Sequence, residues 1–208
     1  MGFNAEKAFA YLDNAEQALD GLQGWLDNTF ASINIYGQEG VDAICAWSGE
    51  WASYKIAQVE SMVVKGLHGA YQGALSHLAI GGPIYNLITG GIKADLGELV
   101  TALLKLAMPW VPPTLAAIQT MVQVPIKVVN IAGKVADLTS YRPPIQPGIS
   151  LSNFQIKAKM ISMGDVISGT FKVPDPPDPF TKYMQASIAQ TKEKLAEEKA
   201  KREQQTNA

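Results

Sequence analysis

The amino-acid sequence predicts a mainly α-helical protein: a helical bundle followed by a proline-rich linker, a small β-hairpin and a charged C-terminal helix. Three observations support this fold class. Apolar residues recur at alternating steps of three and four in several stretches, prolines and glycines separate these stretches, and charge is concentrated near the C-terminus. We expect residues 1–140 to form the bundle and oligomerisation region, residues 141–179 the linker with the hairpin, and residues 180–208 the charged helix or tail.

Charged residues are sparse over most of the chain. They make up 17% of the 208 residues, against roughly 25% in an ordinary soluble domain, and nine of them lie within residues 192–203. A long chain with so few charges elsewhere favours an exterior that is covered by another subunit or component.

The sign of the charge changes along the chain. Residues 1–51 contain eight acidic side chains and one basic one, whereas residues 52–159 contain nine basic and four acidic ones. Opposite charges on successive segments favour docking of one on the other, within a chain or between copies, and chance variation among solvated faces is the alternative. The bases are dispersed without interleaved aromatic residues, which argues against direct nucleic acid recognition.

Two long helices are predicted in the first 80 residues, over residues 4–36 and 40–78. In the second helix, Gly66, Gly69 and Gly73 form a stripe that would let another backbone approach closely, or else mark a kink or break. The first helix carries the apolar seam of a coiled coil or bundle at Leu12, Ala15, Leu19, Leu22, Leu26, Thr29 and Ile33.

Further helical stretches follow, and prolines separate them. One covers residues 84–106, another begins at Pro112 and Pro113, and a third extends from Pro125 to about Ser140. The first of these keeps four-three spacing at Ile92, Leu96, Leu99, Leu103 and Leu106. The last helix is expected to begin near residue 181.

A period of two residues appears after the linker. Apolar residues alternate with polar ones at Phe154, Ile156, Ala158 and Met160, and again at Ile167, Gly169, Phe171 and Val173. Met163, Gly164 and Asp165 offer the turn of a hairpin. Because an isolated hairpin is marginal in water, we expect it to pack on the helices or to add strands to a neighbouring sheet.

No pattern typical of catalysis or metal binding occurs in the sequence, and we predict a non-enzymatic protein without a cofactor. His68 and His77 are nine residues apart, which places them on opposite faces of a helix, and no second ligand pair accompanies them. Cys45 has no basic neighbour and is expected to be a buried structural thiol. The N-terminus lacks a basic region followed by an apolar run, so we expect no signal peptide.

The uncharged stretch of residues 106–126 suggests an alternative function. Its 21 residues match the length of a bilayer span. Four prolines interrupt the stretch, however, and a lipid-exposed helix could not satisfy its backbone there. Burial inside a helical assembly is therefore the favoured interpretation, and a membrane-active protein that inserts this region is the alternative.

An acidic heptad helix, a Gly/Ala/Val-rich helical middle such as residues 90–96, and an alternating hairpin with a Lys/Glu tail occur together in this chain. This combination resembles virion structural proteins of tailed bacteriophages, of the tail-interior, tail-tip or ejection type. The resemblance implies an architectural part of a virion, assembled in the host cytoplasm. Its partners would be copies of itself and other structural proteins of the same particle.

The chain has several heptad-like apolar stripes, which is more than one compact domain normally needs, and it has few charged residues. The sequence therefore predicts a homo-oligomer joined through helical seams. No catalytic, cofactor-binding or metal-binding residue is assigned. The residues expected at the oligomer interface are Leu12, Leu19, Leu22, Leu26, Ile33, Ile92, Leu96, Leu99 and Leu103.

Overall fold

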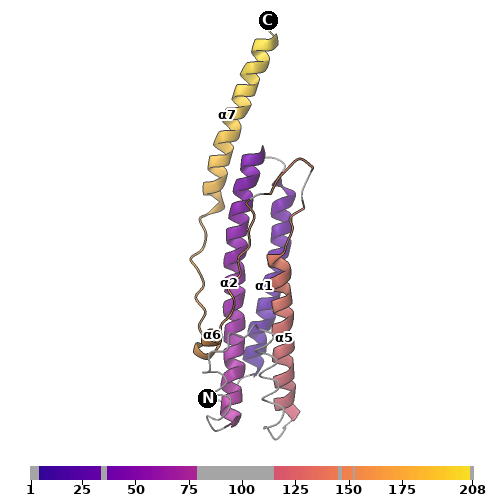
Figure 1. Cartoon of the computed structure of the whole chain (residues 1–208), viewed down its shortest axis with the longest axis vertical. Coiled ribbons are helices and arrows are strands. Elements are labelled where there is room, and N and C mark those ends of the chain that lie inside the picture. Colours follow the sequence, from indigo (N-terminus) through magenta and orange to yellow (C-terminus); the bar gives the residue numbers. More distant parts are fainter. Residues whose placement is uncertain (1–4, 34–36, 79–114, 145–146, 152, 207–208) are drawn as a thin grey trace.

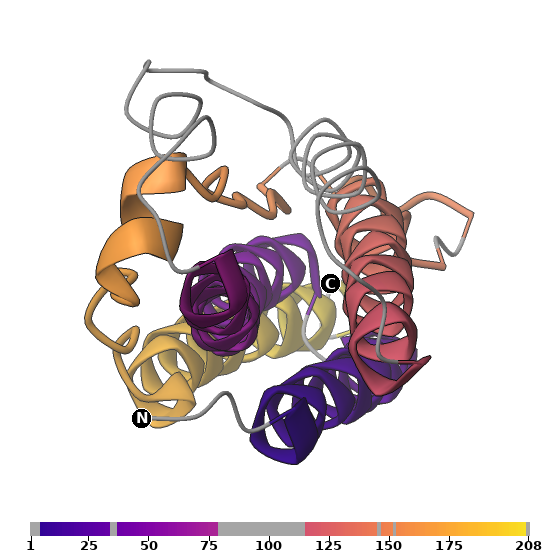
Figure 2. The ribbon, with the colours of Figure 1, turned by 90° about the horizontal axis from the view of Figure 1, so that it is seen from below.

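The computed structural model describes residues 5–33, 37–78, 115–144, 147–151 and 153–206, and it confirms a mainly α-helical fold (Figure 1). The described residues contain no β-strand. Three long helices lie side by side as a bundle, which Figure 2 shows from one end, and a fourth long helix continues past the bundle. The helices are α1 (Ala5–Ala31), α2 (Gly37–Leu78), α5 (Leu115–Thr139), α6 (Met163–Ser168) and α7 (Phe180–Thr206).

Helices α1 and α2 are antiparallel and form the central contact of the bundle. Leu12, Leu19 and Leu26 are spaced by seven residues, and each is at most 1% exposed. They belong to the same hydrophobic core as Ile56 and Val63 of α2. A seven-residue repeat keeps a side chain on one face of a helix over many turns, so the leucine seam of α1 follows the length of its partner.

Gly66 marks a close approach between these two helices. A Cβ atom at this position would lie 3.2 Å from Cγ of Leu12 and 3.4 Å from the carbonyl oxygen of Ala8. At Gly69 a Cβ atom would lie 3.6 Å from Cβ of Ala8. The predicted close approach at the glycine stripe is thus confirmed for these two glycines, and α2 remains helical throughout residues 37–78.

Helix α5 continues through Pro125, whereas the sequence predicts two segments that meet there. A proline inside a helix removes one backbone hydrogen bond and costs about 3 kcal/mol. Val124, Val128 and Ile131 are at most 3% exposed, and burial of such a side chain contributes roughly 1.5–3 kcal/mol. Core packing on both sides of the proline is therefore sufficient to keep one helix. The helix predicted over residues 84–106 lies outside the described residues.

Helices α1 and α5 run parallel in a fixed register. Lys134 Nζ lies 2.9 Å from Oδ1 of Asp20 and 3.0 Å from Oε1 of Glu16. The predicted docking of the acidic first segment on the basic middle of the chain is therefore confirmed, and it occurs within one chain. Three side-chain contacts each join residues 114 positions apart: Asp13 with Lys127, Asp20 with Lys134, and Asp27 with Tyr141.

The hairpin expected over residues 154–173 is not present. Residues 149–161, which we call the strap, are extended where the structure describes them and lie against α2. Gln38 Nε2 donates a hydrogen bond to the carbonyl oxygen of Ser150 (2.7 Å), and the N–H of Lys157 donates one to Oγ of Ser53 (2.8 Å). The period of two at residues 154–160 thus reflects an extended segment on a helical surface, which is the first of the two packing alternatives. The second alternating stretch, at residues 167–173, begins inside a short helix instead.

Helix α6 occupies the position of the expected turn. The Asp165 N–H donates to Oγ of Ser162 (3.2 Å), the Ser162 N–H donates to Oδ2 of Asp165 (2.9 Å), and Gly169 ends the helix at a φ of +69°. These caps satisfy backbone groups locally and favour a short helix over a tight turn. The chain then returns along the bundle to α7 (Figure 1).

Gly49 sets the distance between α2 and the strap, because a Cβ atom there would lie 2.5 Å from the carbonyl oxygen of Gln155. We predict that Gly49→Ala lowers the free energy of unfolding by about 1–3 kcal/mol, as overpacking substitutions do. Gly24→Ala is the control: it is exposed, helical and has no atom within 4 Å of a built Cβ, so it should raise stability by up to about 1 kcal/mol. Urea denaturation measures both, and a stable Gly49→Ala variant would contradict the close contact.

Candidate functional site

The predicted interface residues divide into two sets. Five of them are covered within a single chain, where none is more than 6% exposed: Leu12, Leu19, Leu22, Leu26 and Ile33. In the described structure these five side chains are therefore covered by other parts of the same chain, and their role at an interface between copies stays a prediction. The remaining four, Ile92, Leu96, Leu99 and Leu103, lie outside the described residues.

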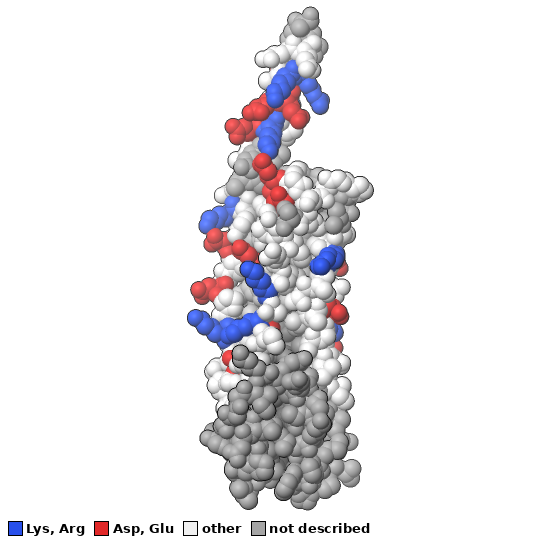
Figure 3. All heavy atoms as spheres, viewed as in Figure 1, with Lys and Arg blue, Asp and Glu red and all other residues white. Residues whose placement is uncertain are grey.

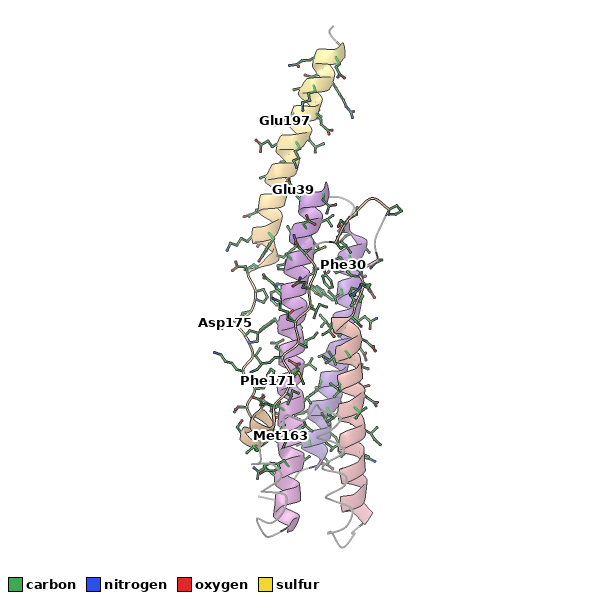
Figure 4. The ribbon with its side chains drawn as sticks, viewed as in Figure 1. Phe30, Glu39, Met163, Phe171, Asp175 and Glu197 are labelled. Atoms are coloured by element: carbon green, nitrogen blue, oxygen red, sulfur yellow. The ribbon has the colours of Figure 1, made fainter. Side chains whose placement is uncertain are left out.

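The exposed part of α7 is the candidate interaction surface. The beginning of α7 lies beside α2, and its end projects beyond the bundle (Figure 1). Residues 192–205 are all exposed. We call residues 195–206 the arm, because they follow Lys194, whose Nζ forms an ion pair with Oε1 of Glu39 in α2 (2.7 Å). Figure 4 shows Glu39 at this exit point and Glu197 on the arm.

Aromatic residues anchor the start of α7. The ring of Phe180 packs on that of Trp47, with a centroid distance of 4.3 Å. Trp47 Nε1 donates a hydrogen bond to the carbonyl oxygen of Asp178 (3.2 Å), and the hydroxyl of Tyr183 donates one to Oε2 of Glu50 (3.2 Å). Trp47 also lies 5.4 Å from Trp25 of α1, so the anchor reaches both helices. The direction of the arm is therefore fixed at its base.

The arm itself is strongly charged but carries one large apolar side chain. Figure 3 shows acidic and basic groups close together along the projecting helix. Leu195 is 54% exposed. In the sequence it continues a stripe with four-three-four spacing that begins at Met184, Ile188 and Thr191. That spacing is typical of a helix that contacts another helix.

A second feature of interest is a cavity between α2, α5 and the strap. It has a volume of about 260 Å³, and Glu60 is the ionisable residue in its described lining. Glu60 is 6% exposed, and its Oε2 atom has no hydrogen-bond partner in the described structure. Burial raises the pKa of Glu60 to about 7, although the backbone N–H and the positive charge of Lys159 both act to lower it.

The cysteine and the first histidine have structural surroundings. Cys45 is buried as predicted, and burial followed by the charge of Asp42 raises its pKa to about 11, which disfavours the reactive thiolate. Nδ1 of His68 lies 2.8 Å from the carbonyl oxygen of Val166, so this ring joins α2 to α6. The described residues contain no group of three or more His, Cys, Asp or Glu side chains placed to bind a metal ion. No helix among them combines the length and hydrophobicity needed to cross a bilayer.

Substitution of a buried seam leucine tests the internal role of the seam. We predict that Leu26→Ala lowers the free energy of unfolding by about 2–5 kcal/mol, because it leaves a cavity in the core. The native mass of the chain should not change, since the side chain is 0% exposed in one chain. Chemical denaturation and light scattering measure the two effects. If the Leu26→Ala variant instead formed a smaller assembly with unchanged stability, Leu26 would lie at an intermolecular interface.

The pH dependence of stability tests the environment of Glu60. A carboxyl whose folded pKa is about 7, above its ordinary value of 4.5, stabilises the fold fully below pH 4.5, and this contribution is lost as the pH rises through 7. We predict that Glu60→Gln removes this loss and is more stable than the wild type at pH 8 by up to about 3 kcal/mol, with a smaller difference at pH 5. Parallel stability curves for the two proteins between pH 5 and 8 would contradict the burial of the carboxyl.

Comparison with known proteins gives no relative. No protein-family model matches the chain. No curated protein and no solved structure shows significant similarity to it.

Proposed function

We propose that the protein is a non-enzymatic structural component of a multiprotein particle, and that it assembles with copies of itself through the arm. The observation that carries this proposal is the exposed helix at residues 195–206, which projects from a bundle whose own seam is already buried. Self-association is therefore assigned to the arm, in place of the seam between Leu12 and Ile33.

The length of the arm supports the need for a partner. The arm is the last twelve residues of the 27-residue helix α7, and residues 195–205 are exposed. Because most helical stability in proteins comes from packing of an apolar face, an exposed helical end gains stability from a partner. Packing of Leu195 against another helix would stabilise the arm, because it would remove this half-exposed side chain from water.

The charge of the arm is compatible with a second copy as that partner. Its acidic and basic side chains are equal in number, so two arms do not repel each other through net charge. The acidic residues are Glu197, Glu198 and Glu203, and the basic residues are Lys199, Lys201 and Arg202.

The virion of a tailed phage is the particle that the resemblance in sequence suggests. An elongated bundle that presents a helix at one end suits an architectural part, because the contact surface lies away from the body and leaves the bundle walls for other structural proteins of the particle. We propose these proteins and copies of the chain as its partners.

A substitution on the arm tests the proposal. We predict that Leu195→Glu abolishes self-association, so that light scattering gives the mass of one chain, 22.4 kDa. The matched control is Ala200→Glu, which adds the same charge five residues later, on a different face of the helix. It should leave the oligomer intact. A wild-type chain that stays monomeric at high concentration, or equal effects of the two substitutions, would refute assembly through the arm.

A further inference from the structure

We propose that the cavity beside Glu60 binds an alkylammonium group, that is, a primary amine carried on a hydrocarbon chain. The cavity is lined by α2, α5 and the strap and opens to solvent on one side, and its described lining combines one buried carboxyl with otherwise uncharged residues. The lining residues that frame it are Val63, Val128, Ala132, Val135, Ala158 and Ile161.

The carboxyl of Glu60 supplies the polar end of the site. The residue is 94% covered, since 6% of its surface is exposed, and Oε2 has no hydrogen-bond partner within the described residues. An unsatisfied buried oxygen of this kind costs about 1–3 kcal/mol. A donor that also carries positive charge would satisfy the oxygen and would favour the ionised form of the carboxyl.

The apolar lining of the cavity favours a ligand with a hydrocarbon chain over a metal ion. Ca²⁺ takes six to eight oxygen ligands, and this cavity offers one carboxyl. A volume of about 260 Å³ exceeds the roughly 150 Å³ cavity that holds benzene, so a short alkyl chain fits against the valines and isoleucines. A neutral alcohol could donate one hydrogen bond to Oε2 but would add no positive charge inside the cavity beside an ionised Glu60.

The charged surroundings of Glu60 come from the strap. Lys159 provides a backbone hydrogen bond and a positive charge, and its ammonium group lies 5.1 Å from the ring centroid of Phe171. The residues of α5 that line the cavity are uncharged, and α2 contributes Glu60 as its ionisable residue there. Binding of an ammonium therefore requires loss of the Glu60 proton, and affinity should rise between pH 6 and pH 8.

The amine can come from a free molecule or from a lysine side chain of a neighbouring subunit, because both present the same group. Met160, which lines the cavity, is 75% exposed, so the lining reaches the surface and an extended side chain can enter from outside. This assignment is independent of the arm, since the cavity and the arm involve different residues.

Calorimetric titration of the full chain at pH 8 tests the site, with n-hexylammonium and 1-hexanol as probes of equal length. We expect n-hexylammonium to bind at least ten-fold more tightly than 1-hexanol. Glu60→Gln should remove this preference while the protein stays folded, which circular dichroism checks. The affinity for n-hexylammonium should fall at pH 6.

A second variant separates the contribution of the cavity space to binding from that of the Glu60 charge. Ala132→Leu keeps Glu60 but fills space next to it, and should weaken binding of both probes at least ten-fold. Equal affinities for the two probes in the wild type, or n-hexylammonium binding that neither variant changes, would overturn the proposal, as would absence of binding at millimolar concentration. Nα-acetyl-lysine methylamide, titrated in parallel, distinguishes the sources: affinity equal to that of n-hexylammonium indicates a lysine side chain, and weaker affinity indicates a free amine.

Discussion

The seven-residue repeat of α1 is the constraint on which the rest of the structure depends. Leucines occupy one position of the repeat and aspartates occupy the next, as at Leu19 and Asp20. Adjacent residues on a helix point about 100° apart, so the two stripes face different neighbours. The leucines are buried in the core with α2, and the aspartates contact Lys127 and Lys134 of α5. One helix therefore sets the register of both partners.

The low charge of the chain has a partly internal explanation. The sequence suggests that a surface with so few charges must be covered, and the described structure shows one cover that belongs to the same chain. The strap lies on α2, and Phe154 of the strap packs edge-on against Phe30 at a centroid distance of 5.1 Å. Tyr141 completes this aromatic cluster, and burial together with its hydrogen bond to Asp27 raises the pKa of its hydroxyl. Extended segments thus cover helical surface that heptad spacing alone would assign to another subunit.

The sequence was sufficient for the long helices, because their apolar periodicity lies within one segment. It was also sufficient for the docking of opposite charges, because the net charges of residues 1–51 and 52–159 have opposite signs. It was insufficient for the hairpin, since a period of two indicates a half-buried extended segment but not the surface beneath it. The capping pair Ser162 and Asp165 was the available signal for α6. An apolar stripe looks the same in sequence whether its cover is internal or external, so the stripe of Leu19 predicts an interface although the described structure covers it within one chain. The cavity beside Glu60 was not predictable, since the segment that closes it lies a hundred residues later in the chain.

The distance along the chain between contacting partners has a consequence for how the molecule is made. Helices α1 and α2 are adjacent in sequence and can pair as soon as both have left the ribosome. The contacts of Asp20 with Lys134 and of Trp47 with Asp178 can form only after the later residue of each pair has been synthesised. Contacts between such remote residues form slowly, because long loops must close first. During synthesis the α1–α2 pair therefore exposes the acidic side chains that α5 later contacts and the α2 surface that the strap later covers. This nascent intermediate is the species that a chaperone would meet.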